Sequence, residues 1–222
     1  MKNFIILLFS TTLLVNTLKA QVLEGHVVYT ITTTTDNPDM QMVIGMMDGS
    51  KMEMYFSKDK TRSQMSMGAL MNVTTISDNQ TGDVVMLMDG MNGKSAIKSN
   101  TADMKADSDS SNFKITLVDE SKKILGYNCK KAISTDSEGY ESIYWYTNDL
   151  VIAKKGQAYL NASVPGFPLE FDIYNNGIKM TMIASTFEEK IDKSLVKNLF
   201  DMTIPADFPT ITKEELLKTG GM

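Results

Sequence analysis

Apolar residues at every second position constrain the fold of this chain more than any other feature. Successive side chains of a β-strand point to opposite faces of a sheet, so a period of two places one set of residues on one face. Asp48-Gly49 and the segment from Lys58 to Lys60 supply turns between such sets. The alternating positions are Met40, Met42, Ile44 and Met46, then Met52, Met54 and Phe56, then Met65 and Met67.

The pattern predicts an antiparallel meander with one methionine-rich face. On that face we expect to find Met42, Met52, Met54, Phe56, Met65 and Met67.

The remainder of the chain also favours strands. The run from Val84 to Met88 is apolar at every position, which is typical of a central strand covered on both faces. Asp192 and Thr212 are placed to cap short helices over residues 193–199 and 212–219. With about eleven strands and two short helices, we expect an all-β, mainly antiparallel fold. Residues 21–222 show no internal boundary and are expected to form a single β-rich domain.

The first residues are typical of an export signal. Lys2 supplies a positive start, the apolar run from Phe4 to Val15 follows, and a small residue precedes Gln21. That run is shorter than the ~20 residues of a membrane span. We therefore expect cleavage after residue 20, no integral membrane segment in the mature form, and a periplasmic or secreted location. A polar stretch from Ser99 to Asn112, rich in aspartate and serine, is expected to be a flexible loop.

Charge and residue counts exclude several functions. The net charge of −5 becomes −7 once Lys2 and Lys19 leave with the signal (−5 − 2), which disfavours nucleic acid and anionic membrane surfaces as partners. His26 and Cys129 are the only histidine and cysteine. Nucleophilic catalysis and zinc sites need such residues in groups, so we expect no enzyme, no metal site of that type and no cofactor. Cys129 is expected to be a buried small residue.

Two lysine pairs, Lys122-Lys123 and Lys130-Lys131, remain open to two interpretations. They could face a partner or a headgroup, or they could be solvated side chains opposite Asp119 and Glu120.

A family resemblance rests on several short motifs. They are Ile-Leu-Gly-Tyr-Asn-Cys-Lys-Lys-Ala from Ile124 to Ala132, Tyr-Trp-Tyr-Thr from Tyr144 to Thr147, and Phe-Asp-Met-Thr-Ile-Pro-Ala-Asp-Phe from Phe200 to Phe208. In this order they resemble small exported proteins of Gram-negative bacteria grouped as a domain of unknown function. That group is related to the periplasmic lipoprotein-carrier fold (LolA and LppX-like). It is also related to the GLPGLI family, whose signature is half present in Val-Pro-Gly-Phe-Pro-Leu from Val164 to Leu169.

The resemblance implies a curved antiparallel half-barrel with an apolar concave face, which holds acyl chains or a lipopeptide in characterised relatives. It carries over no catalytic residue.

The methionines, 18 in all, allow three interpretations. Methionine fills irregular cores, and the same softness suits an adaptable ligand-binding surface. Thioethers also prefer Cu(I), and Met46-Met47 and the segment from Met86 to Met91 lie near turns that an ion could reach. We expect a hydrophobic ligand, either a lipid or an acylated protein, on a methionine-lined face, with a Cu(I)-binding or purely structural envelope protein as the alternative. The expected ligand-binding residues are Met42, Met52, Met54, Phe56, Met65, Met67, Met86 and Met88.

Overall fold

The computed structural model describes residues 21–22, 24–101, 114–137, 139–152, 164–175 and 177–218. The predicted export signal over residues 1–20 lies outside the described residues, as does the predicted loop from residue 102 onward. Ser99 and Asn100, which the sequence assigned to that loop, belong instead to a strand. In the described part of the chain, no helix is both long and apolar enough to span a membrane.

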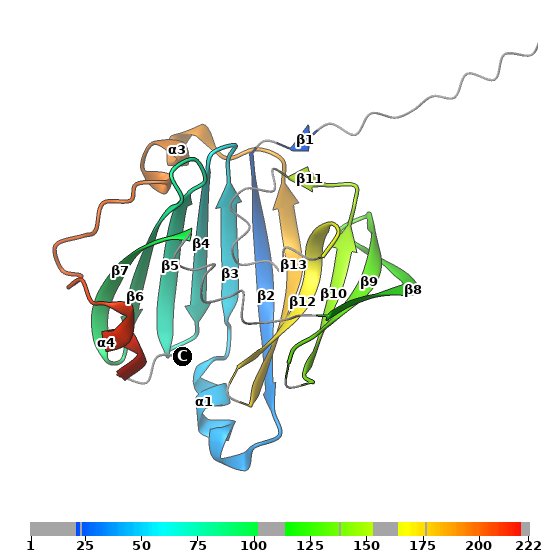
Figure 1. Ribbon diagram of the computed structural model, residues 1–222, viewed down its shortest axis with the longest axis horizontal. Coiled ribbons are helices and arrows are strands. Elements are labelled where there is room, and N and C mark those ends of the chain that lie inside the picture. The colour runs from blue at the N-terminus through cyan, green and yellow to red at the C-terminus, as the bar shows by residue number, and fades with distance from the viewer. Residues whose placement is uncertain are drawn as a thin grey trace, which may run out of the picture.

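The fold is mainly β, with one open antiparallel sheet of 11 strands (Figure 1). Its order is β7-β6-β5-β4-β3-β2-β13-β12-β10-β9-β8. The N-terminal meander therefore forms one half of the sheet, and β13 joins it to the other half beside β2. The strands are β2 (Gly25–Thr35), β3 (Lys51–Phe56), β4 (Lys60–Met67), β5 (Met71–Asp78), β6 (Asp83–Gly90), β7 (Gly93–Asn100), β8 (Lys114–Ile124), β9 (Tyr127–Thr135), β10 (Glu141–Thr147), β12 (Phe167–Asn175) and β13 (Ile178–Glu188).

The other elements are short. β1 (Gln21–Val22) and β11 (Val151–Ile152) form a small parallel pair. The helices are η1 (Pro38–Met40), α1 (Gln41–Met46), α3 (Lys193–Leu199) and α4 (Lys213–Lys218). The antiparallel β class is thus confirmed, while the helices outnumber the two that the sequence predicted.

The predicted capped helices are confirmed in place and in chemistry. The Asp192 side chain accepts a hydrogen bond of 2.8 Å from the Ser194 N–H at the start of α3. At α4, Thr212 and Glu215 form a reciprocal capping box. The Thr212 N–H donates to the Glu215 carboxylate at 2.8 Å, and the Glu215 N–H donates to the Thr212 hydroxyl at 3.2 Å. These bonds satisfy N–H groups that the first helical turn leaves unpaired.

The prediction of a strand from Met40 to Met46 is wrong, because this segment is η1 followed by α1. Pro38 occupies the start of η1, and the Asn37 side chain accepts a hydrogen bond from the Asp39 N–H, which is a helix-start signal. Met42 consequently points to solvent, with 79% of its surface exposed, and does not join the methionine-rich face.

A close approach ties the end of α1 to the turn between β4 and β5. The Ala69 N–H donates to the Met46 carbonyl at 2.8 Å. Gly68 has a positive φ of 55°, and a Cβ at this position would lie 2.2 Å from the Met46 carbonyl oxygen. Only glycine fits at position 68. The close approach allows the turn to hold α1 against one end of the sheet (Figure 1).

Candidate functional site

Strand register brings the remaining predicted site residues onto one face of the sheet, which we call the methionine face. Residues paired across antiparallel strands share a face. One row of paired residues crosses the sheet as Tyr29, Met52, Met65, Val73 and Met88. The next row is Val27, Met54, Ser63, Thr75 and Met86, and Phe56 lies on the same face beside Thr61.

Most of these side chains are buried. The exposed fractions are 3–6% for Met52, Met54, Phe56, Met67 and Met88, whereas Met65 and Met86 are half-buried. The shared face predicted from the period-two pattern is therefore confirmed for every listed residue of β3 and β4, and Met86 and Met88 of β6 lie on the same face. Met42 in α1 is the exception.

An aromatic half, which the predicted site residues did not include, continues the methionine face. The Tyr29 and Phe171 rings meet edge to face at a centroid distance of 5.5 Å, and Tyr144 stacks on Phe171 at 6.0 Å. The Tyr29 hydroxyl donates to the Pro168 carbonyl at 2.9 Å, and burial raises the pKa of this phenol. The methionines of β3 and β4 and the aromatic half meet at β2 and form one apolar cluster. The alternate positions of Tyr144 and Tyr146 were the sequence signal that could have predicted this aromatic half.

The groups that cover the methionine face include residues from outside the sheet. Met47, Leu150 and Val164 belong to the same buried cluster, and Val43 and Ile44 of α1 pack against it. α1 therefore covers one end of the face with uncharged, half-buried side chains.

Hydroxyl groups interrupt this apolar surface between β3 and β6. Ser63 and Thr75 face each other across β4 and β5, and so do Thr61 and Ser77. All four residues are buried. Within the described part of the chain, the Ser77 hydroxyl has no hydrogen-bond partner. The sequence pattern does not reveal this group, because serine and threonine also occur on the solvent-exposed face of an ordinary strand.

The two residues that could support catalysis have separate surroundings. His26 stacks on Tyr55 with ring centroids 4.0 Å apart, and its ring nitrogens lie 3.8 Å from Glu53 and 3.9 Å from Glu188. Cys129 is buried, as predicted, and its thiol donates to the Tyr127 carbonyl at 3.7 Å. Burial raises the pKa of the Cys129 thiol, which disfavours the nucleophilic thiolate.

In each of the two lysine pairs, one side chain forms an ion pair with a described residue. Lys131 lies 3.0 Å from Glu120, one of the two predicted partners, whereas Lys122 lies 2.6 Å from Glu170 and 4.4 Å from the Trp145 ring. Lys123 and Lys130 form no ion pair with a described residue and line a cavity of about 630 Å³ beside Cys129.

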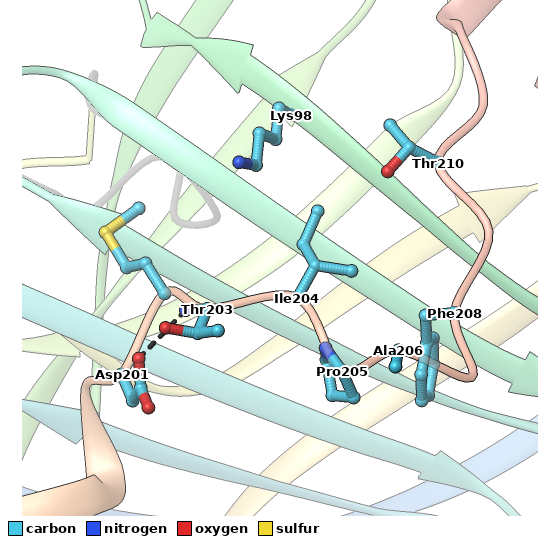
Figure 2. Close-up of a pocket in the computed structure, with 9 residues that line it drawn as sticks. Lys98, Asp201, Thr203, Ile204, Pro205, Ala206, Phe208 and Thr210 are labelled. Carbon is cyan, nitrogen blue, oxygen red and sulfur yellow. Dashed lines mark hydrogen bonds between the residues drawn. The ribbon is translucent and has the colours of Figure 1, made fainter.

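A second cavity, of about 640 Å³, lies on the opposite face of the sheet beneath the C-terminal segment. Figure 2 shows this segment crossing the strands, with Ile204 and Lys98 directed toward each other. Arg62 donates to the Leu199 carbonyl at 3.3 Å, and Ala96 exchanges backbone hydrogen bonds with Pro209 and Ile211. The motif from Phe200 to Phe208 thus belongs to a segment that packs over the face of the sheet opposite the methionine face.

The copper alternative rests on Met86 and Met88, which point to the same face of β6. Met88 is buried, while Met91 at the following turn is 71% exposed. Met46 is half-buried and Met47 is buried. Within the described residues, no group of three or more histidine, cysteine, aspartate or glutamate side chains could hold a metal ion.

Comparison with known protein families identifies the family of the chain. Residues 37–160, more than half of the sequence, match the family described as "Domain of unknown function (DUF4412)". The chain belongs to this family. The match spans the region from η1 past β11, and so includes the methionine half of the sheet. A search of curated protein sequences found no match.

Solved structures show a related arrangement of strands at low identity. PNGF-II matches with a TM-score of 0.50 in its P21 crystal form and 0.49 in its C2 form, each at 16% identity over 88% of this chain. The chain spans about a third of PNGF-II, 33% and 32% in the two forms. An uncharacterized conserved protein from Thermus thermophilus matches at 11% identity and a TM-score of 0.44, over 86% of this chain and 93% of that one. These similarities concern the fold alone.

Proposed function

We propose that this protein is an exported, non-enzymatic binding protein whose methionine face holds a hydrophobic ligand, either a lipid or an acylated partner. The resemblance to the lipoprotein-carrier fold (LolA and LppX-like) supports a curved half-barrel and a periplasmic or secreted location. Among the described residues, His26 stacks on Tyr55 and Cys129 donates to the Tyr127 carbonyl, and these separate surroundings support the non-enzymatic assignment.

The observation that carries this proposal is the pair of methionine-containing rows across β3, β4 and β6. Thioether side chains adapt to ligands of varied shape because they are unbranched and polarizable. Most methionines of the face are already buried, so the gain on binding comes mainly from burial of the ligand's own hydrocarbon, ~0.8 kcal/mol per CH₂, or ~8 kcal/mol for a chain of about ten methylenes. Association itself costs ~4–15 kcal/mol. The balance favours modest, reversible binding, which suits a carrier.

Access to the face requires a cover to move, and α1 is the element best suited to this role. It has six residues and no charged side chain, and Met42 is exposed on its outer side. Its hold on the sheet comes from the half-buried Val43 and Ile44 and from the bond between Ala69 and Met46. So short a helix with few buried contacts opens at low free-energy cost. Exposed Met42 gives an arriving acyl chain a first apolar contact.

A fluorescent apolar dye tests the proposal. N-phenyl-1-naphthylamine brightens in apolar surroundings, and we expect it to bind the protein saturably. The variants Met65→Gln and Met86→Gln change half-buried residues of the face, so they should weaken dye binding while the fold survives. Met91→Gln is the matched control, because the same change occurs at an exposed turn residue. No saturable dye binding, or equal loss in all three variants, contradicts the proposal.

A further inference from the structure

The hydroxyl patch within the methionine face carries an inference about the ligand. The patch consists of Thr61 and Ser63 on β4 and of Ser77 and Thr75, which face them on β5. The exposed fractions of these residues are only 1–6%. Ser and Thr side chains are mostly found on protein surfaces, so a buried group of this size calls for an explanation.

The unpaired hydroxyl of Ser77 lowers the stability of the folded state. A polar group buried without a hydrogen bond destabilises the folded state by about 1–3 kcal/mol. The Ser77 Oγ is in this position, because no described group accepts or donates a bond to it. Alanine or valine here would avoid the penalty. Among the described residues the hydroxyl therefore has no partner, and a group from outside the chain can supply one.

The surroundings of the patch define that partner. Phe56 and Met54 of β3 flank it on one side, and Val84 and Met86 of β6 flank it on the other. A chain that lies across the strands meets an apolar, then a hydroxyl-bearing, then an apolar surface. The partner is therefore a polar group within a largely apolar molecule.

The charge of the surrounding residues limits which polar group the ligand can carry. The residues of β3 to β6 that share these rows carry no charged side chain. A carboxylate or phosphate would be desolvated here with no cation among these residues to pair with, at a cost of several kcal/mol. A neutral acceptor is the group that a serine or threonine O–H can satisfy in such a place.

We propose that the hydroxyl patch binds the ester or amide carbonyl of an acylated ligand, with Ser77 as a hydrogen-bond donor. This inference rests on the proposed function and specifies it: the ligand is an acyl ester or amide, and its carbonyl lies between β4 and β5. The methionines on either side contact the hydrocarbon part.

The test compares two probes of the same number of non-hydrogen atoms, methyl decanoate and n-tridecane. Each is used to displace N-phenyl-1-naphthylamine from the full chain. Removal of a hydroxyl in Ser77→Ala or Thr75→Val should weaken displacement by the ester about three- to tenfold, the equivalent of one hydrogen bond. Displacement by the hydrocarbon should not change. Thr75→Ser keeps the hydroxyl and should retain ester affinity.

A hydroxyl removed from the opposite face provides the control. Thr74→Val alters the neighbouring residue of β5, whose side chain points away from the methionine face, and should leave both probes unaffected. Equal affinity of all the variants for the ester would overturn the inference and leave the patch with a buried water only. If the wild-type protein binds neither the dye nor the hydrocarbon, the proposed function itself fails. Ser63→Ala repeats the experiment if a first variant does not fold.

Discussion

Replacement of Met52 by glutamine should destabilise the protein by about 1–3 kcal/mol, the range for a polar group buried without a partner. Met52 is 4% exposed, and its cross-strand neighbours are Tyr29 and Met65. The Tyr29 hydroxyl already donates to Pro168, so it offers the new amide little. Met54 is a weaker test, because Ser63 lies opposite and could accept or donate a bond.

Urea denaturation followed by circular dichroism measures this effect. For a slope of about 2 kcal/mol per molar urea, a loss of 2 kcal/mol lowers the midpoint by about 1 M. Met91→Gln makes the same change at an exposed residue and should stay within about 0.5 kcal/mol of wild type. Met52→Leu preserves apolar volume and should cost less than about 1.5 kcal/mol.

Unfolding of Met52→Gln at the same urea concentration as Met91→Gln would contradict this prediction. That result would mean that the methionine face is wet in solution, and that its burial does not stabilise the fold.

Other predictions concern the cover, the metal alternative and the thiol. Ile44→Asn should loosen α1 and raise the rate of dye uptake in stopped-flow fluorescence, while an unchanged rate would remove α1 as the moving cover. The double variant Met86→Leu with Met88→Leu should keep lipid-probe binding, whereas tight Cu(I) binding by wild type that this variant loses would favour the copper alternative. Cys129 should react with iodoacetamide only when urea unfolds the chain, because the thiol is buried and its pKa is raised; fast reaction of the native protein would contradict this.

The period-two pattern predicted the strands well where polar residues alternate with apolar ones. In β3 and β4, Lys51, Glu53 and Gln64 mark the opposite face, so the facing of Met52 and Met65 was fixed by sequence. In the segment from Met40 to Met46 almost every residue is apolar, so a period of two could not be distinguished from a helical period. The Asn37-Pro38 helix-start signal decided the structure there.

The hydroxyl patch could not be predicted from local pattern. Ser63 and Thr75 face each other only through the register of β4 and β5, and a serine among methionines is typical of a solvated position. Likewise, the motif from Phe200 to Phe208 pointed to a family but not to its place over the opposite face. That place depends on long-range contacts such as those of Arg62 with Leu199 and Ala96 with Pro209.

Native mass spectrometry of the exported protein is the most direct test of ligand binding, because it detects a bound molecule without the choice of a probe. We expect a population heavier than the apo chain, whose extra mass is released on denaturation, extracts into organic solvent and contains an acyl ester or amide. The same preparation of Met65→Gln with Met86→Gln should carry less of it, and Met91→Gln should carry as much as wild type. A single apo mass in wild-type protein, unchanged after incubation with lipid extract, would contradict ligand binding and leave the methionines as core residues.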